Sequence, residues 1–348
     1  YEYDSNNQLS RIQIPGVGHI TVNGTHWNRP VAMTYPGGVT RRYGYDPLMR
    51  LQSIEVRDPG GNILMDYEYT YDRMNNIILK DTEHGHYSYE YDVLYQLIDA
   101  DNPTLDDETY TYDAVGNRKT EMGIEGAWIY NKNNELLTYD NVTLDYDDNG
   151  NTTVKIENGQ TTKYFYNVED RLVRLEDDSE TVVAEYYYDP FGRRLSKKKD
   201  GDTTYFYYSD EGLIGEFNEN GIEVKSYGYA PGSFWMTDPL YIKNVSYYTF
   251  FHNDHLGTPQ KIVRLNGITV WEAKYSAFGE TTINSTLNFT SNLRFPGQYY
   301  DIENGMHYSF NRYFKPSIGR YVRLDPNGLD GGINLYNYVQ NNPIIEVD

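Results

Sequence analysis

The chain has 348 residues, a formal net charge of −21, no cysteine and 38 tyrosines. Without cysteine, it has no disulfide framework and no thiolate to serve as a nucleophile or metal ligand. The acidic balance argues against nucleic-acid binding, which needs clustered lysine and arginine side chains, and no apolar stretch approaches the ~18 residues that cross a membrane.

Aromatic residues make up 16% of the chain, so the aliphatic share of its hydrophobic content is low. Low hydrophobicity with high net charge is typical of disorder, but this aromatic content argues against it. Tyrosine is a strand former with an apolar ring and a polar tip. We therefore expect a thin β-sheet with water on both faces rather than a compact core.

One phrase, Tyr-x-Tyr-Asp followed by turn-forming residues, recurs about every twenty residues along the first part of the chain. Clear copies end at Asp4, Asp46, Asp72, Asp92 and Asp113. Degenerate copies follow at residues 130–131, 146–147, 166–167 and 188–189. Tyrosines two apart lie on one face of a strand, and Asp followed by Gly or Asn forms a turn. Each unit is therefore predicted to be a β-hairpin.

A single hairpin is only marginally stable in water, so these units must pair edge to edge with their neighbours. The right-handed twist of strands then turns the row into a long coiling sheet. Helices are not expected, because no apolar pattern with a 3.6-residue period persists for three turns. The predicted fold is all-β, a spiral of antiparallel hairpins. Because the chain opens inside a repeat, at Tyr1, we expect it to be part of a longer protein.

Three other features have weaker interpretations. The basic run at residues 193–199 is interpreted as a solvated hairpin edge that discourages aggregation. Residues 145–150 open like an EF-hand calcium loop, but an isoleucine stands where that loop requires a bidentate Glu. His252, Asp254 and His255 could form a zinc trio, but two histidines three apart on a strand face opposite sides, which favours a structural role. We predict no metal and no cofactor.

The C-terminal third carries more specific phrases. They are His-Asn-Asp-His-Leu-Gly-Thr-Pro at 252–259, Trp-Glu-Ala-Lys-Tyr-Ser-Ala-Phe-Gly at 271–279, Arg-Phe-Pro-Gly-Gln-Tyr-Tyr-Asp at 294–301, Asn-Arg-Tyr-Phe at 311–314, Gly-Arg-Tyr-Val at 319–322, Asp-Pro-Asn-Gly-Leu at 325–329 and Asn-Leu-Tyr-Asn-Tyr at 334–338. Residues 343–348 match a Pro-x-x-x-x-Asp-Pro-x-Gly-Leu signature as far as its first Asp. With the repeats, these phrases resemble the Rhs/YD-repeat proteins, which include the C-components of bacterial Tc toxins and, more distantly, teneurins.

The resemblance implies that the spiral closes into a hollow cocoon. Residues 1–245 would form the YD-repeat shell, and residues 246–348 an Rhs core, continuous with the shell, that plugs one end. The implied function is to enclose a toxic C-terminal passenger, which is released inside the shell when the chain cleaves itself at the signature. Such a protein would be a single-turnover aspartyl autopeptidase acting in cis, with no activity on other proteins expected.

The resemblance also implies partners and a location. The partners would be the passenger itself, the N-terminal remainder of the shell or a partner shell protein, a secretion-system component and an immunity protein. The protein would fold in the cytoplasm and then be delivered out of a bacterial cell or held at its surface. An acidic shell would attract a basic passenger.

By motif, the family's catalytic residues fall on Asp325 and Asp348, with Arg312 as the supporting cation. Carboxylate-catalysed peptide hydrolysis needs two acids close enough to share a proton, one activating water and the other protonating the carbonyl. An arginine nearby can hold one carboxylate ionised or stabilise the oxyanion. The residues themselves also fit a simpler interpretation, because Asp-Pro-Asn-Gly at 325–328 is a good type I turn.

The main alternative is a cell-surface adhesion or carbohydrate-binding protein, as in wall-associated or teneurin-like YD proteins. In that case, exposed tyrosine ledges would stack on sugar rings. Cross-strand packing is the structural alternative for the same tyrosines. The paired carboxylates favour the toxin container, because adhesion does not need them.

Overall fold

The computed structural model describes residues 1–124, 126–245 and 247–348. Within these ranges the regular elements are β-strands and three short 3-10 turns, and no α-helix occurs. The described residues include no helix that is long and apolar enough to span a membrane. The all-β class predicted from the repeats is confirmed.

Four sheets account for the strands. The 12-stranded sheet contains, in spatial order, β1 (Glu2–Tyr3), β2 (Leu9–Ile14), β3 (Gly18–Val22), β6 (Ala32–Thr34), β7 (Thr40–Tyr45), β8 (Leu51–Arg57), β9 (Ile63–Tyr71), β10 (Ile77–Thr82), β11 (Gly85–Tyr91), β12 (Leu97–Asp101), β13 (Glu108–Tyr112) and β14 (Arg118–Glu121). The 16-stranded sheet contains β15 (Ile129–Tyr130), β16 (Leu136–Tyr139), β17 (Val142–Tyr146), β18 (Thr152–Glu157), β19 (Gln160–Tyr166), β20 (Leu172–Glu176), β21 (Val182–Tyr188), β22 (Arg194–Lys199), β23 (Asp202–Ser209), β24 (Gly212–Asn218), β25 (Glu223–Tyr229), β26 (Pro239–Asn244), β27 (Tyr247–Asn253), β28 (Pro259–Arg264), β29 (Thr269–Tyr275) and β30 (Thr281–Ser285). The smaller elements are β4 (Thr25–His26) with β5 (Arg29–Pro30), the sheet β31 (Tyr299–Asp301), β32 (Met306–Ser309), β33 (Arg312–Lys315) and β34 (Arg320–Tyr321), and the 3-10 turns η1 (Pro316–Ile318), η2 (Gly328–Gly331) and η3 (Val339–Asn341).

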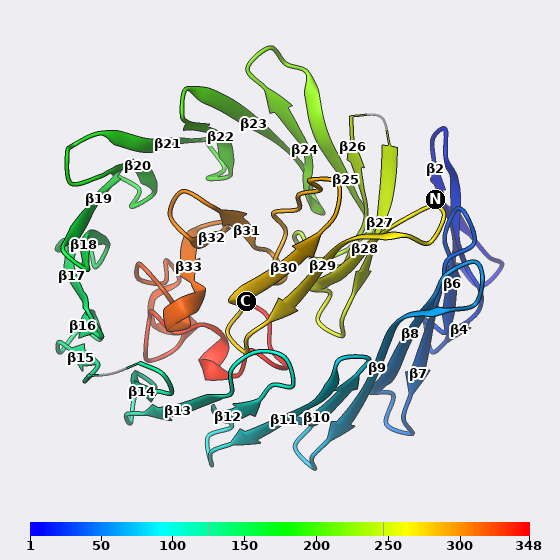
Figure 1. The fold of residues 1–348 in the computed structure, drawn as a ribbon, viewed down its shortest axis with the longest axis horizontal. Helices are drawn as coiled ribbons and strands as arrows, with labels where there is room; N and C mark the ends of the chain where they lie inside the picture. Colours follow the sequence, from blue (N-terminus) through cyan, green and yellow to red (C-terminus); the bar gives the residue numbers. More distant parts are fainter. Residues whose placement is uncertain (125, 246) are drawn as a thin grey trace.

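The two large sheets form one coiling wall of hairpins. Strands that pair are almost always consecutive in sequence, and the pairing is antiparallel throughout. Figure 1 shows the wall running as a ring from the N-terminal strands through β14 and β21 and back, with β29 and β30 turning inside it. The second sheet lies against the first at this overlap, where Arg41 Nη2 donates to the carbonyl of Asn253 at 2.8 Å. The predicted spiral of hairpins is confirmed.

Each hairpin unit is held by its Asp and its second Tyr. The carboxylate of Asp72 accepts backbone N–H groups from Met74 and Asn76, each at 2.8 Å, and closes the turn. The hydroxyl of Tyr71 reaches back to the carbonyl of Leu51, in the preceding hairpin, at 2.6 Å. The same reach to an earlier hairpin recurs at Tyr45, Tyr91, Tyr112, Tyr188, Tyr208 and Tyr275. The second tyrosine of the repeat therefore supplies a hydrogen bond that links each hairpin to an earlier one.

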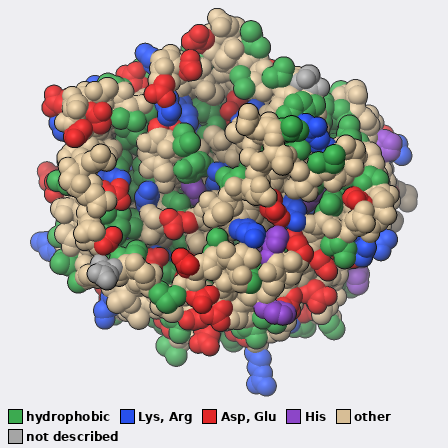
Figure 2. Space-filling model, in the orientation of Figure 1, with side chains coloured by type: hydrophobic (Ala, Val, Ile, Leu, Met, Phe, Trp, Pro, Cys, Tyr) green, Lys and Arg blue, Asp and Glu red, His purple; other side chains and the backbone are tan. Residues whose placement is uncertain are grey.

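The inner face of the wall is buried in this segment. Tyr67, Tyr69, Tyr87 and Tyr89 are only 4%, 3%, 6% and 7% exposed, whereas the residues between them along the strands are more accessible. The expectation of water on both faces is therefore wrong here. The reason is that the C-terminal residues fill the ring, and Figure 2 shows side chains occupying the space between the ribbons of Figure 1.

The small sheet β31–β34 is the part that packs into the ring. Its contact with β22 corrects the interpretation of the basic run, because Arg194 is fully buried against Asp301. Lys197 Nζ lies 2.8 Å from Asp301 and 3.3 Å from Glu303. Arg194 and Lys197 are thus ion-paired inside the molecule, and not solvated at an edge.

The division at residues 245 and 246 remains a prediction. The strands on either side of it, β26 and β27, pair within the same sheet. Any functional boundary here lies within a continuous wall, as expected for a core that is continuous with its shell.

Candidate active site

The structure brings Arg312, Asp325 and Asp348 together. Arg312 begins β33, Asp325 precedes η2, and Asp348 follows the last turn of the core. Nη1 of Arg312 lies 2.9 Å from Oδ2 of Asp325, and Nη2 lies 2.7 Å from Oδ2 of Asp348. One guanidinium therefore bridges the two carboxylates that the sequence placed 23 positions apart.

The two contacts differ in geometry. The bond to Asp348 is a hydrogen bond, whereas Nη1 makes no hydrogen bond and pairs with Asp325 by charge and proximity. The side chains of Arg312 and Asp325 are 7% and 9% exposed, and that of Asp348 is 38% exposed. Water can therefore reach the pair from the side of Asp348.

A tight turn holds the carboxylate of Asp325 in place. The N–H of Gly328 donates to the carbonyl of Asp325 at 3.0 Å, and the N–H of Asn327 donates to its Oδ1 at 2.8 Å. This is the turn that the sequence predicts for Asp-Pro-Asn-Gly, so the structural and catalytic interpretations of the motif are compatible. A Cβ added to Gly331 would lie 2.6 Å from Oδ2 of Asp325, which shows how closely the backbone approaches the carboxylate.

Tyr321 completes the cluster and was missed as a site residue in the sequence. The guanidinium of Arg312 lies 3.5 Å from the centre of the Tyr321 ring, and the Tyr321 hydroxyl donates to Oδ2 of Asp348. Burial raises the pKa of this hydroxyl well above its ordinary value, so it stays protonated as a donor. Tyr321 lies in the Gly-Arg-Tyr-Val phrase at 319–322, and this phrase could have indicated it as a site residue.

The cluster borders a cavity of about 800 Å³. Both carboxylates line it together with four aromatic side chains, which are Phe191, Phe234, Trp235 and Phe310. Phe191 and Phe234 are 76% and 73% exposed, which is high for such large apolar side chains. Phe310 has a left-handed backbone, with φ of 47°, a strained conformation for a bulky residue. The cavity thus joins an apolar wall to a pair of acids.

This arrangement matches the needs of carboxylate hydrolysis. In carboxylate-catalysed hydrolysis, one carboxyl group is ionised and the other holds a proton. The ionised partner can accept a proton from water, and the protonated partner can donate to the substrate. The neighbouring apolar wall can hold an extended peptide.

The other candidate residues have structural contacts. The carboxylate of Asp147 accepts backbone N–H groups of Asn149 and Asn151, so the EF-hand-like residues form an ordinary repeat turn. His252 is fully buried and packs edge-on against Tyr35, and His255 Nε2 contacts the carbonyl of Ile344 at 2.6 Å. These contacts agree with the structural role that was favoured for the histidines.

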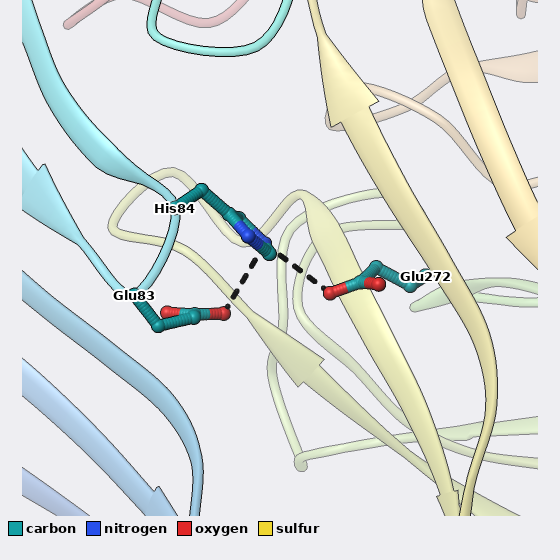
Figure 3. Close-up of side chains that lie close together, drawn as sticks. All are labelled: Glu83, His84 and Glu272. Carbon is teal, nitrogen blue, oxygen red and sulfur yellow. Dashed lines mark ion pairs between the residues drawn. The ribbon is translucent and has the colours of Figure 1, made fainter.

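A different group of metal-type ligands joins the two sheets. Among the residues that the structure describes, Glu83, His84 and Glu272 place their ligand atoms within 4.8 Å of one another. Figure 3 shows the two carboxylates pointing toward the His84 ring. However, Nζ of Lys261 lies 2.7 Å from Glu83 and 2.9 Å from Glu272. One ammonium already pairs with both carboxylates, so the group is an ion-pair network that fastens β28 and β29 to the turn after β10.

Comparison with known proteins identifies the family. The family profile described as Teneurin YD-shell matches residues 38–344. The chain belongs to the Rhs/YD-repeat shell family. The predicted resemblance is confirmed.

Relatives of this YD-shell chain include proteins named as a toxin and as a nuclease. It is 32% identical to Double-stranded DNA deaminase toxin A of Burkholderia cenocepacia, over 92% of this chain and 25% of the relative. It is 31% identical to tRNA nuclease WapA of Bacillus subtilis, over 91% of this chain and 14% of the relative. The chain therefore spans a quarter or less of the length of these relatives.

A solved structure shows the same fold. A chain in the Photorhabdus luminescens Tc holotoxin pore superposes with a TM-score of 0.79 at 21% identity. The match covers 100% of this chain and 20% of that one. The fold of this chain therefore occurs within a chain about five times as long.

Proposed function

We propose that this chain is the closed end of a toxin-enclosing shell and that it cleaves its own polypeptide with Asp325 and Asp348. Residues 1–245 would serve as wall, and residues 246–348 as the plug that carries the autopeptidase. The observation that carries the proposal is the bridging of both carboxylates by Arg312 beside an aromatic cavity. Membership of a family whose relatives are named as toxins supports the enclosing role.

The proposed reaction is hydrolysis of one peptide bond. The ionised carboxylate takes a proton from water as its oxygen attacks the scissile carbonyl carbon, and the protonated carboxyl donates to that carbonyl. Arg312 and the Tyr321 hydroxyl keep the carboxylates in position. Collapse of the tetrahedral intermediate breaks the C–N bond and returns a proton to the amine, giving a new carboxyl terminus and a new amino terminus.

The substrate would be the chain's own continuation. By the resemblance, the cleaved bond would lie after the leucine of the signature whose first part is matched at residues 343–348. Asp348 lines the cavity, and we propose that residues joined to it enter the same space. Such a bond is presented in cis, so the reaction occurs once per molecule and needs no external substrate.

The test is a set of substitutions in the complete protein that contains this chain. We expect Asp325→Asn and Asp348→Asn each to stop release of a C-terminal fragment, as followed by mass spectrometry. Asp330→Asn is the matched control, because Asp330 is an exposed acid in the neighbouring η2 turn. Release that persists in both active-site variants would refute the aspartyl mechanism.

The adhesion alternative receives less support. Several of the tyrosines proposed as sugar-stacking ledges are buried in the inner face, for example Tyr69 at 3% and Tyr110 at 2% exposure, although Tyr1 and Tyr3 are exposed. They pack against residues of the second sheet, as Tyr110 does edge-on against Phe278. These tyrosines form the core of the molecule.

The charge of the shell suits a basic passenger. The net charge is −21, and acidic side chains are spread across the face seen in Figure 2. The named relatives act on DNA and tRNA, and proteins that bind nucleic acid are usually basic. We propose a positively charged passenger, export from a bacterial cell after folding, and partners among secretion and immunity proteins. A passenger with net negative charge would contradict the electrostatic part.

A further inference from the structure

A second cavity adjoins the core sheet, apart from the candidate active site. Its volume is about 890 Å³, and it lies between the inner strand β30, the core sheet and the loops that flank β13 and β14. It shares no lining residue with the cavity at Asp325 and Asp348. Strand β33 contributes to both, because Arg312 at its start contacts the active-site carboxylates and Lys315 at its end lines the second cavity.

Three basic side chains line this second cavity. They are Arg294 before β31, His307 in β32 and Lys315 at the end of β33. Arg294 and His307 are only 4% and 1% exposed. Burial, and then the nearby charges of Arg294 and Lys315, lower the pKa of His307 well below its ordinary value. The three groups therefore act as one positively charged cluster, which we call the basic patch.

Among the residues that the structure describes, the basic patch makes no ion pair. Nη1 of Arg294 donates to the backbone carbonyls of Ser291 and Leu293, both at 2.9 Å, and Nε has no partner. Nζ of Lys315 donates to the carbonyl of Gly305 at 3.3 Å. The cations that fasten the wall to the core pair with carboxylates instead. Because a buried charge without a counter-charge is costly, an anion in this cavity would be stabilised.

The rest of the charged lining is acidic. Its carboxylates are those of Asp106, Asp107, Glu108, Glu121 and Glu280. Asp106, Asp107 and Glu280 are exposed, so these three acids lie toward solvent while the basic patch is buried. Acids on the solvent side repel a free polyanion and attract a ligand that also carries positive charge. The cavity therefore favours a molecule with a carboxylate at one end and a cation at the other.

We propose that this cavity binds a zwitterion of the basic amino-acid class, with its carboxylate on the basic patch and its cationic side chain beside the exposed acids. A guanidinium fork suits a carboxylate, and the volume is in the range of small-molecule sites. The recognised chemistry is a carboxylate next to a basic side chain, as in free lysine or in a lysine at a peptide C-terminus. The inference does not depend on autoproteolysis.

Isothermal titration calorimetry of the complete protein tests the ligand. We expect L-lysine to bind with a dissociation constant below about 20 mM. L-lysinamide, in which a neutral amide replaces the carboxylate, should bind at least tenfold more weakly. L-norleucine, which lacks the side-chain ammonium, should bind at least threefold more weakly. Absence of L-lysine binding, or equal affinity for L-lysine and either analogue, would overturn the proposal.

The peptide Gly-Gly-Lys distinguishes the two sources of this chemistry. Binding as tight as that of L-lysine would assign the cavity to a peptide terminus. Binding at least tenfold weaker would assign it to the free amino acid. Both results support a site for the carboxylate and the basic side chain together.

Variants locate the binding in this cavity. Lys315→Gln removes one charge of the basic patch at a half-buried position and should weaken L-lysine binding at least fivefold. Arg294→Gln should weaken it further, but it also removes two backbone hydrogen bonds, so Lys315→Gln is the decisive variant. Lys163→Gln is the control, because Lys163 pairs with Glu180 outside the cavity, and it should bind normally.

Unchanged binding of L-lysine in folded Lys315→Gln protein would overturn the proposal. Asp325→Asn should bind L-lysine as the parent does, because Asp325 does not line this cavity. That comparison keeps the test independent of cleavage.

Discussion

At the scale of single residues, the active-site cluster depends on how close the backbone comes to Asp325. Arg312 touches both carboxylates, and its planar fork allows two contacts that a lysine ammonium could not hold in the same way. The contact of Nη1 with Asp325, however, lacks the geometry of a hydrogen bond. Its geometry is therefore set by the turn around Asp325, and Gly331 forms the wall behind that carboxylate.

Gly331→Ala should displace this carboxylate without unfolding the protein. The added Cβ would lie 2.6 Å from Oδ2 of Asp325, while no left-handed φ forbids an alanine at this position. We expect fragment release to slow by at least tenfold, which equals a barrier increase of about 1.4 kcal/mol. The measurement is the time course of cleavage in the complete protein, with circular dichroism to verify the fold.

Gly60→Ala serves as the control for this substitution. Gly60 also lacks a left-handed φ, but its Cβ would meet neighbours no closer than 3.2 Å in an exposed turn far along the chain. Cleavage should proceed normally in that variant. An unchanged rate in folded Gly331→Ala protein would show that the position of Asp325 does not limit the reaction.

At the scale of the hairpin element, the tyrosine hydroxyl bond fastens each unit to the one before it. Tyr91 donates to the carbonyl of Ile77 at 2.7 Å, and the bond is partly shielded from water. Tyr91→Phe keeps the ring and removes only the hydroxyl, so it leaves an unpaired carbonyl. We expect a loss of about 1 kcal/mol in the free energy of unfolding, as measured by urea denaturation.

The bond should act in the same way in distant units. Tyr229 makes an equivalent contact with the carbonyl of Leu213 at 3.1 Å. Because the two sites share no partners, the losses in Tyr91→Phe and Tyr229→Phe should add in the double variant. Tyr207→Phe is the control, since Tyr207 is 65% exposed, and its effect should stay below about 0.5 kcal/mol. Equal losses at Tyr91 and Tyr207 would contradict a role for the bond.

The local sequence predicted the hairpins correctly, but it did not predict which of their side chains are buried or what they contact. Tyr-x-Tyr-Asp specifies a strand, its face and a turn within a few residues, so the hairpins and the spiral could be inferred. The burial of Arg194 could not be inferred, because its partner Asp301 lies more than a hundred positions away. For the same reason, the prediction that water covers the inner face was wrong, and the sequence did not indicate the role of Tyr321. The grouping of Arg312, Asp325 and Asp348 was predicted from family phrases, and their spacing alone did not indicate it.

At the scale of the whole molecule, the wall and the core are joined by buried charge as well as by tyrosine rings. Arg194 and Lys197 fasten the second sheet to Asp301 in the core. Lys261 fastens the inner strands to Glu83 in the first sheet. Breaking one partner of such a pair leaves a buried charge without compensation, which is costly. Loss of one partner should therefore destabilise the contact between the wall and the core.

Histidine titration should make the molecule less stable below neutral pH. His252 and His307 are 0% and 1% exposed, and burial, reinforced by nearby cations, lowers the pKa of each well below its ordinary value. In the unfolded chain the same groups titrate near about 6.5. Unfolding therefore takes up protons below that pH, so this contribution to stability is complete above about pH 6.5 and is lost as the pH falls, at about 1.4 kcal/mol per pH unit for each histidine.

Replacing one histidine should remove one proton from the number taken up on unfolding, and so make stability depend less steeply on pH. We expect the free energy of unfolding of His307→Gln, followed by urea denaturation between about pH 5 and 7, to fall less steeply with acid by about 1.4 kcal/mol per unit. Comparison with the parent protein cancels the contribution of Glu108 and Glu121, whose pKa values burial raises in both proteins. Parallel curves for His307→Gln and the parent would show that His307 already takes up its proton in the folded state. That result would require water or a counter-charge inside the core. It would have to lie beside Gln298, which contacts His307 at 2.6 Å.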